Sequence, residues 1–559
     1  MNNFLKFKVC ILLTFVLLIS SCGIKKSINN RPDLSKYNSN IPKKIVLNDS
    51  TAHTGNNFIT KNKYGLWELY VEGDPLEIGL ITGSLTNKLM YKQERVFFDK
   101  INELVPSEGK QKFLRKFLSW YNRKMYQYIT NEYRSEIYGV TRYASSDFNS
   151  IATPYLRSLY LHGAHDIGHA LQDLALVGCT SFAAWGNKTE DGKLLIGRNF
   201  DFYAGDAFAE NKIIAFVNPT SGHNFMSITW GGMIGVVSGM NDKGLTVTIN
   251  AGKSKIPLVA KTPISMVARE ILQYASNIEE AVDIASKREV FVSESILIGS
   301  AKDKKAVLIE VSPSHFGVYE VENTNLLICS NHFQSEPYKN DRRNIKTIEE
   351  SHTQYRYDRM IELLSSEEKV NPIKAVEILR NKKGLNDKII GFGNEKALNQ
   401  LLAHHSIVFQ PEDLKVWVST NPYQLGEFVA YDLNDVFKNR EGNSLNTSLS
   451  QNDITIAKDP FLETTDYLNY EEYRILESQV EHATLDNIKL NDKDLELLVN
   501  LNPEYWKAYK LIGEYYYEHR QYSKALKFFE MTSKKEIPTL PDTEFISKRI
   551  KKSRRKLKQ

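Results

Sequence analysis

The chain has little cysteine and little net charge for its length. Its 559 residues include four cysteines, and Lys plus Arg exceed Asp plus Glu by only five. So small a net charge gives no reason to expect a nucleic-acid partner. So few cysteines exclude a disulfide-built scaffold. An apolar fraction of 42% and a charged fraction of 25% indicate an ordinary globular protein, long enough for roughly two to four domains.

Long apolar runs are also missing, except at the N-terminus. Lys6 and Lys8 precede the apolar run Val9–Ile19, which predicts a secretory signal and is too short for a mature membrane span. Ile19-Ser20-Ser21-Cys22 resembles a bacterial lipobox, in which the cysteine carries lipid and begins the mature chain. We therefore expect an envelope protein anchored to a membrane through Cys22, facing the periplasm from the outer membrane in a Gram-negative cell. A plain signal peptide cut near Ser21 is the alternative.

The apolar spacing changes twice along the chain. Three- and four-residue steps predict helices before Cys179, for example at Phe113–Tyr128 and Tyr155–Leu176, and again beyond about Tyr467. Between these regions, short strands and helices alternate in blocks, which favours an α+β fold with antiparallel sheets. The expected domains are a signal peptide at 1–21, a tether at 22–60, a helical propeptide-like region at 61–178, a catalytic domain at 179–440, a helical domain at 465–540 and a basic tail at 541–559.

The strands and helices of the central region are predicted from alternation, three- and four-residue steps and glycine-containing turns. The expected strands are Thr180–Trp185, Leu194–Phe200, Lys212–Val217, Phe225–Trp230, Ile234–Ser238, Leu245–Asn250, Val290–Gly299, Ala306–Val311, Gly317–Glu322, Leu326–Ser330, Ser406–Phe409, Leu414–Ser419 and Glu427–Asp432. The expected helices are Pro263–Tyr274, Ile278–Lys287, Tyr357–Leu364 and Pro372–Arg380.

The C-terminal helices have the spacing of a tetratricopeptide repeat (TPR), which suggests a protein partner. The residues that fit this spacing are Tyr509, Ile512, Gly513, Tyr516, Ala525 and Phe529. A generic helical hairpin is the alternative. The basic run Lys548–Lys558 is expected to be a solvated, disordered end, with attraction to anionic lipid as the second hypothesis.

Cys179 is the candidate nucleophile, because it follows Gly178 where a helical region meets a strand. Attack of its thiol on the Gly178 carbonyl would give a thioester, and water would then release Cys179 as a new N-terminus. An α-amine has a pKa near 8, so it can act as general base for its own thiol. The alternatives are a buried packing cysteine and a disulfide with Cys329.

The strand after Cys179 turns back at Asp191-Gly192 into Arg198-Asn199-Phe200-Asp201. A Cys-Thr-Ser strand that returns as Arg-x-x-Asp resembles the N-terminal-nucleophile (Ntn) hydrolases. The closest resemblance is to the acyl-CoA:6-aminopenicillanic acid acyltransferase family, related to choloylglycine hydrolase and penicillin V acylase. Over about residues 155–435 it implies a four-layer αββα sandwich, with Asp201 orienting the new amine and Arg198 lowering the thiol pKa. A hairpin ion pair is the alternative for Arg198 and Asp201.

Three later stretches agree in order with this resemblance. Asn250, on the strand after the Gly239–Leu245 turn, matches the amide that donates to the oxyanion, a contact worth roughly 3–4 kcal/mol. Asn331 would hold the Cys179 amine or the substrate carbonyl. Arg356 matches the family arginine, although Ser351 lies five residues before it rather than three. Turn formation is the alternative for both asparagines.

Two histidine pairs offer other chemistry. His165-Asp166-Ile167-Gly168-His169 imitates a zinc-protease helix, but Asp is shorter than the usual Glu and no third ligand is near. We expect neither metal nor cofactor. His404-His405 would serve Cys179 in a Cys–His arrangement without self-cleavage.

The resemblance implies acyl transfer through a Cys179 thioester to water or to an amine. Water is abundant for an exported protein and acyl-CoA is not, so we expect hydrolysis of a small-molecule amide. The competing hypothesis is a membrane-anchored scaffold with an inactive hydrolase domain and a TPR-like partner site.

Overall fold

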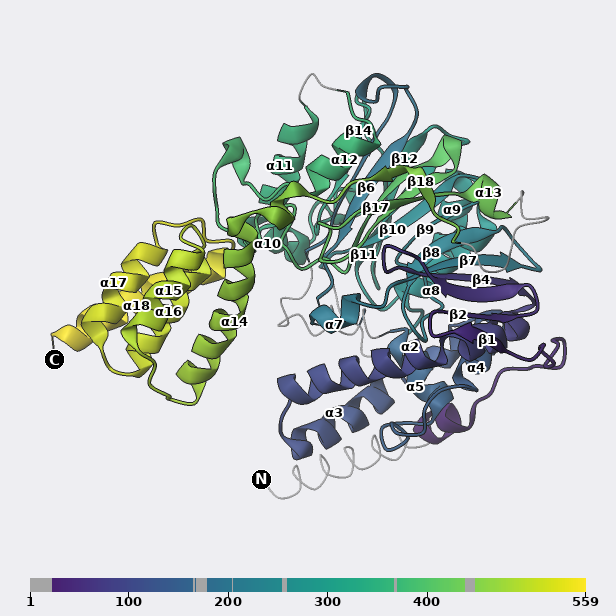
Figure 1. Ribbon diagram of the computed structural model, residues 1–559, viewed down its shortest axis with the longest axis horizontal. Helices are drawn as coiled ribbons and strands as arrows, with labels where there is room; N and C mark the ends of the chain where they lie inside the picture. Colours follow the sequence, from purple (N-terminus) through teal and green to yellow (C-terminus); the bar gives the residue numbers. More distant parts are fainter. Residues whose placement is uncertain are drawn as a thin grey trace, which may run out of the picture.

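Two β-sheets form the centre of the protein (Figure 1). The computed structural model describes residues 23–163, 166, 178–203, 205–253, 259–365, 369–437 and 448–558. The expected signal peptide and Cys22 lie outside these residues. Within the described ranges, all strand pairs are antiparallel except β4 with β7, which confirms the expectation of antiparallel sheets.

The larger sheet has eleven strands in the order β1-β2-β3-β4-β7-β8-β9-β10-β11-β12-β13. Their bounds are β1 Ile45–Asn48, β2 Thr51–Thr54, β3 Asn57–Lys61, β4 Trp67–Gly73, β7 Ile213–Pro219, β8 Phe225–Thr229, β9 Ser238–Asn241, β10 Leu245–Ala251, β11 Glu294–Ser300, β12 Lys305–Val311 and β13 Phe316–Tyr319.

The smaller sheet has seven strands in the order β14-β5-β6-β15-β16-β17-β18. Their bounds are β14 Leu326–Cys329, β5 Thr180–Ala184, β6 Leu195–Phe200, β15 His405–Gln410, β16 Lys415–Ser419, β17 Phe428–Asp432 and β18 Gln451–Ile456. Every residue of β5 and β6 is buried, which is why both read as short apolar runs in the sequence.

One apolar cluster joins side chains of both sheets. It includes Phe216, Met240 and Leu297 from the larger sheet and Ile196, Ile407 and Val418 from the smaller one. Helices α8 (Ile264–Tyr274) and α9 (Ile278–Ser286) contact the larger sheet, and α11 (Thr353–Leu364) and α12 (Pro372–Leu379) contact the smaller sheet. The amphipathic spacing predicted these helices correctly.

The segment before Cys179 contains strands, whereas we predicted a tether followed by a mostly helical region. Strands β1 to β3 lie largely inside the expected tether, and β4 pairs with β7 over seven residues. These strands are four to seven residues long and partly polar, and β1 is exposed along its whole length, so alternation gave little signal. The N-terminal segment therefore supplies one edge of the larger sheet.

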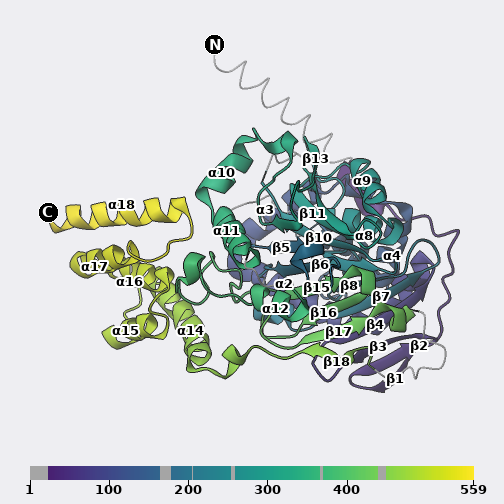
Figure 2. The same ribbon diagram turned by 90° about the horizontal axis from the view of Figure 1, so that it is seen from above.

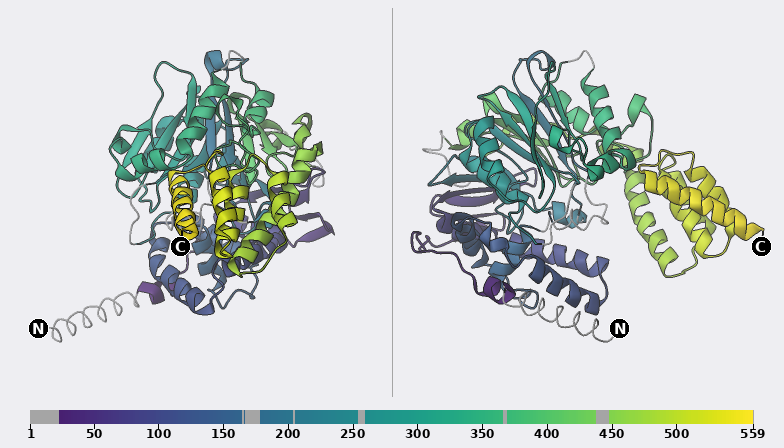
Figure 3. Two further views of the ribbon diagram at one scale, coloured as in Figure 1. Left: turned by 90° about the vertical axis from the view of Figure 1, so that its left-hand side faces the viewer. Right: turned by 180° about the vertical axis from the view of Figure 1, so that it is seen from behind.

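Helices α2 (Pro75–Leu104), α3 (Glu108–Tyr121), α4 (Asn131–Thr141) and α5 (Pro154–Leu161) lie on one side of the sheets (Figure 3). Helix α2 begins with a capping box, in which the Asp74 side chain accepts from the Glu77 backbone and the Glu77 side chain accepts from the Asp74 backbone. Along its length, α2 packs against α4.

The C-terminal helices form a lobe beside the sheets (Figures 1 and 2). They are α14 (Thr465–Leu485), α15 (Asp492–Leu501), α16 (Trp506–Glu518), α17 (Tyr522–Thr532) and α18 (Leu540–Leu557). Gly513 of α16 packs on the Phe529 ring of α17, where a Cβ would approach to 2.8 Å. This confirms a helical pair, while its identity as a TPR stays a prediction.

The basic tail is helical, in contrast to the expected disorder. Phe545, Ile546 and Ile550 of α18 pack on the apolar core of the lobe, and Thr539 caps its first turn. Ile546 and Ile550, four residues apart, are thus hidden among many lysines and arginines. Across the described residues, the helices are each too short or too polar to cross a membrane.

Candidate active site

Cys179 lies directly before β5, and its thiol is buried and free. The β5–β6 register pairs Ser181 with Arg198, which brings the Arg198 guanidinium to 3.9 Å from the Cys179 Sγ. The Gly178 N–H donates to the Asp201 carbonyl at 3.3 Å. The hairpin expected from the sequence therefore brings Cys179, Arg198 and Asp201 together.

Arg198 is buried and held by neighbouring strands. Its guanidinium donates to the Val237 carbonyl at 2.8 Å, to Ser238 Oγ at 2.5 Å and to the Ile249 carbonyl. Burial raises the pKa of Cys179 to about 11, and the Arg198 charge acts in the opposite direction. The Cys179 thiol is thus protonated at neutral pH.

The peptide bond before Cys179 is held by two side chains. Arg356 Nη1 donates to the Gly178 carbonyl at 2.7 Å and to the Cys179 carbonyl at 2.8 Å, and Gln400 Nε2 donates to the Gly178 carbonyl at 3.2 Å. Arg356 lies in the first turn of α11, as its predicted role requires. Gln400 was missed, because a lone glutamine in a connecting segment carries no sequence signal.

Asp201 is a buried carboxylate whose two oxygens have no hydrogen-bond partner within the described ranges. Burial raises its pKa to about 7, although Arg356 and Arg198 both act to lower it. An unpaired buried charge is costly, so this carboxyl is set to take up a proton or to pair with a new cation.

Asn250 lies near the end of β10 in the larger sheet, and Asn331 lies two residues after β14 in the smaller sheet. Asn250 Nδ2 donates to the Cys329 carbonyl at 3.2 Å, and its Oδ1 accepts from Ser181 at 3.0 Å. Asn331 Nδ2 donates to the Ala251 carbonyl at 2.9 Å, and its Oδ1 accepts from Arg356 at 2.6 Å. In the uncut chain both amides are therefore engaged by protein groups.

The structure gives no support to the histidine and disulfide alternatives. His405 hydrogen-bonds Ser238 and His404, and no histidine in the described ranges hydrogen-bonds Cys179. Burial holds the pKa of His405 well below its usual value. Cys329 is a free thiol. Both histidines of the zinc-like motif lie outside the described residues, while Asp166 accepts from the Ile264 N–H at 2.8 Å.

Neither of two cavities in the described residues is lined by a candidate catalytic residue. A small, mostly apolar hollow of about 50 Å³ is lined by Met90, Phe97, Phe202, Phe208, Trp230 and Met233, among others. The larger cavity, about 1400 Å³, lies between α12, β18 and the α15–α16 connection, and its lining includes none of the candidate catalytic residues.

Comparison with known proteins finds a family match within the sheet region. The model of a family described as acyl-coenzyme A:6-aminopenicillanic acid acyl-transferase matches residues 187–422, which is less than half of the chain. The match begins after Cys179 and includes Arg198, Asp201, Asn250 and Arg356. The matched residues therefore do not include the candidate nucleophile, Cys179.

Two curated relatives are similar to the chain. One is an uncharacterized protein from Archaeoglobus fulgidus, 27% identical over 45% of each chain. The other is an N-acylethanolamine-hydrolyzing acid amidase from Caenorhabditis elegans, 24% identical over 35% of this chain and 55% of the relative. The chain spans about half the length of the curated relatives it matches.

Among solved structures, similar chains include a Caenorhabditis elegans N-acylethanolamine-hydrolyzing acid amidase ortholog and a penicillin V acylase from Agrobacterium tumefaciens. The first is 20% identical with a TM-score of 0.31, over 42% of this chain and 93% of that one. The second is 13% identical with a TM-score of 0.31, over 48% of this chain and 88% of that one.

Proposed function

We propose that the protein is a self-cleaving cysteine Ntn hydrolase with a four-layer αββα catalytic domain. It cuts the Gly178–Cys179 bond and then hydrolyses a linear amide through a Cys179 thioester. The observation that carries this proposal is the Gly178 carbonyl, which lies beside a buried thiol and accepts hydrogen bonds from Arg356 and Gln400.

Self-cleavage begins with the Cys179 thiol and the Asp201 carboxylate. Asp201 takes the thiol proton, the Sγ bonds to the Gly178 carbonyl carbon, and charge collects on the carbonyl oxygen. The Cys179 nitrogen then takes the proton and the C–N bond breaks, which leaves a thioester and a free amine. Water adds to the thioester and releases the Gly178 carboxyl group and the Cys179 thiol.

The mature site uses the new amine as general base for the thiol. The Asp201 carboxylate, which has no hydrogen-bond partner within the described ranges, becomes the natural acceptor for this amine. The Arg198 charge near the Sγ favours the thiolate. Loss of the Gly178 side of the site gives room for a substrate carbonyl, which Asn250 and Asn331 would then bind.

The proposed substrate is a small-molecule amide. A relative is named for hydrolysing N-acylethanolamines, which are amides. We favour water over an amine as acyl acceptor. An inactive scaffold is disfavoured because five charged and amide residues are all present near Cys179: Arg198, Asp201, Asn250, Asn331 and Arg356.

We also propose that Cys22 carries a lipid anchor that holds the enzyme at the cell envelope. The lipobox-like sequence supports this. Replacement Cys22→Ser should move the protein from the membrane fraction to the soluble envelope fraction. An unchanged membrane fraction for Cys22→Ser would refute the anchor.

The first experiment compares wild type with Cys179→Ala by intact mass and N-terminal sequencing. We expect two fragments in the wild type, one starting at Cys179, and a single chain in the variant. Turnover of a chromogenic amide should be lost in Cys179→Ala. Uncut chains in both proteins refute self-cleavage, and equal background turnover in both supports the scaffold instead.

A further inference from the structure

We propose that Gln400 is a catalytic residue of the self-cleavage step. Its side-chain amide acts with Arg356 to stabilise the oxyanion that forms on the Gly178 carbonyl. The proposal rests on the proposed function, because it concerns the same Gly178–Cys179 cut.

Both donors already lie on the oxygen that would become negative. Arg356 Nη1 is at 2.7 Å and Gln400 Nε2 at 3.2 Å from the Gly178 carbonyl oxygen. Gln400 is only 4% exposed, so water does not replace its amide, and a donor fixed before the reaction stabilises a developing charge most strongly.

Gly178 lets the Gln400 side chain approach closely because it has no Cβ. A Cβ on Gly178 would come to 2.5 Å from Gln400 Nε2, closer than real Cβ contacts. The residue before the cut must therefore lack a side chain so that the Gln400 amide reaches the carbonyl. The proposal therefore explains why residue 178 is a glycine: a side chain there would keep the Gln400 amide from the carbonyl.

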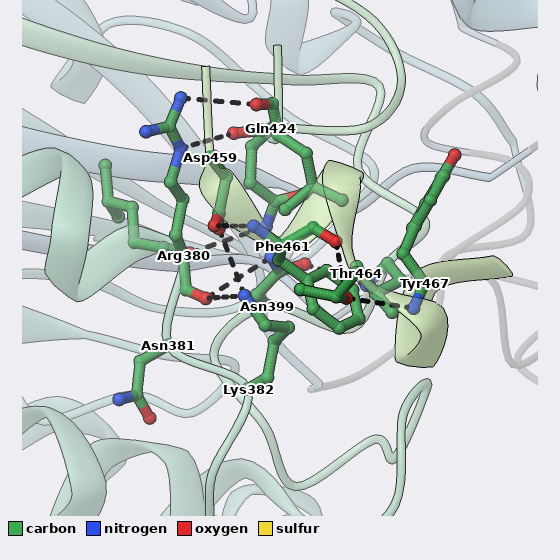
Figure 4. A network of polar contacts seen from close by, with 12 residues as sticks. Arg380, Asn381, Lys382, Asn399, Gln424, Asp459, Phe461, Thr464 and Tyr467 are labelled. Carbon is green, nitrogen blue, oxygen red and sulfur yellow. Dashed lines mark hydrogen bonds and ion pairs between the residues drawn. The ribbon is translucent and has the colours of Figure 1, made fainter. Parts of the chain in front are cut away.

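The backbone on either side of Gln400 is fixed. The Asn399 N–H donates to the Asn381 carbonyl at 2.9 Å, and the Asn399 side chain donates to the Arg380 carbonyl at 3.4 Å. Figure 4 shows Arg380 and Asn399 within this network. On the other side, Leu401 belongs to the apolar core of the C-terminal lobe. Gln400 thus lies in a segment that contacts the Gly178 carbonyl at Gln400 and the C-terminal lobe at Leu401.

Gln400 is separate from the groups assigned to the substrate carbonyl, whereas Arg356 also donates to Asn331 Oδ1. In the described part of the chain, the amides of Asn250 and Asn331 donate to the Cys329 and Ala251 carbonyls, and that of Gln400 donates to Gly178. When Gly178 leaves, the carbonyl that Gln400 served leaves with it. Gln400 should therefore matter for maturation and little for turnover.

The test is a pulse-chase of full-length chains in cell-free synthesis, with cleavage at 178/179 followed by mass. We expect Gln400→Ala to slow cleavage roughly 100-fold, the usual effect of one lost oxyanion donor. Gln400→Glu should be slower still, because a carboxylate repels the oxyanion. Amide turnover per cut chain should stay within about threefold of wild type.

The matched control is Gln424→Ala. Gln424 is also buried, but its side-chain amide donates to the Leu379 carbonyl rather than to Gly178. It should cleave at the wild-type rate. Unfolding midpoints of both alanine variants, measured in the Cys179→Ala background, separate misfolding from a lost donor.

Three outcomes overturn the assignment. They are wild-type cleavage in Gln400→Ala, equal slowing in Gln424→Ala, and turnover per cut chain that falls in step with cleavage. An uncut wild type refutes the proposed function instead, whereas a cut wild type with an unaffected Gln400→Ala refutes only the role of Gln400.

Discussion

The protonation state of Asp201 depends on pH and decides whether this carboxyl can accept a proton from the buried Cys179 thiol. Its pKa is raised to about 7 by burial, while that of the Cys179 thiol is raised to about 11. At neutral pH the pair therefore consists of a protonated thiol and a half-ionised carboxyl. The carboxylate is the form that can accept the thiol proton.

Self-cleavage should accelerate as pH rises through 7. Below that pH the raised pKa leaves Asp201 protonated, so the ionised fraction, and with it the cleavage rate, falls about tenfold per pH unit. Above about pH 8 the rate should level off. Asp201→Asn should slow cleavage roughly 10²- to 10⁴-fold and remove this pH dependence. Cleavage rates of both proteins from pH 5 to 9 check this, and an identical profile in Asp201→Asn would contradict it.

At the residue scale, the sequence predicted most of the residues that the structure brings together around Cys179. Cys179, Arg198 and Asp201 share a hairpin motif, and Arg356 lies near a helix start, so a pattern was available. Gln400 acts from a connecting segment over two hundred residues away from Gly178, and only the folded chain brings the two together.

At the element scale, helices α2 and α4 pack closely, and glycines make that approach possible. A Cβ on Gly79 would overlap the Glu136 carbonyl, and one on Gly139 would come to 2.7 Å from the Leu80 nitrogen. The pattern of side chains along α2 does not predict this close packing, because the contacts are made by backbone atoms.

Gly79→Ala should lower the free energy of unfolding by about 1–3 kcal/mol, since the two helices must move apart. Urea unfolding in the Cys179→Ala background measures this without the complication of cleavage. Gly109→Ala in α3 is the matched control. Gly109 is exposed, and a Cβ there would lie 3.9 Å from its nearest neighbour, Ser107 Oγ, so alanine should be neutral or raise stability by up to about 1 kcal/mol. Equal effects at both positions would refute the packing argument.

Among the elements, those with long periodic patterns were predicted and the short polar ones were not. Strands β10 to β12 and helix α8 follow their apolar residues closely. The strand expected at Ile234–Ser238 is wrong in its bounds, because the observed strand β9 covers Ser238–Asn241. Pairing with β10 starts only at Ser238, and the Asn241 side chain closes the turn between β9 and β10 by accepting from the Leu245 N–H. Pairing partners decide such boundaries, and alternation does not encode them.

At the scale of the whole molecule, the proposed cut divides one folded unit. Strand β4 lies before Cys179 and β7 after it, and they pair side by side. Glu136 of α4 and Arg269 of α8 form a buried ion pair across the same division, at 2.9 Å. The two fragments thus share one sheet and one core.

We expect the fragments to stay together after the cut. Native mass spectrometry of the wild type should give the sum of both fragments, and denaturing conditions should give the two separately. Separation on size exclusion without denaturant would contradict this expectation.

The C-terminal lobe holds the segment that carries Gln400. Asn502, at the end of α15, accepts from the Phe392 N–H at 3.1 Å and donates to the Phe392 carbonyl at 2.8 Å. Gly391 lies so close to Tyr505 that a Cβ would overlap its backbone. The lobe therefore contacts the cut site indirectly, through one continuous segment.

Asn502→Ala should slow self-cleavage several-fold, because it removes both hydrogen bonds from Phe392. Asn491→Ala, at the other end of α15, is the control. It removes a helix cap worth about 1 kcal/mol and leaves the Phe392 hydrogen bonds in place. Cleavage rates of the two variants in the pulse-chase decide the matter, and equal rates would contradict the role of the contact.

This arrangement gives the order of synthesis a consequence. The C-terminal helices that hold the Gln400 segment are synthesised some three hundred residues after Cys179. A nascent chain in which these helices have not yet folded would lack this support for Gln400. In the proposed mechanism, self-cleavage would therefore follow folding of the C-terminal lobe.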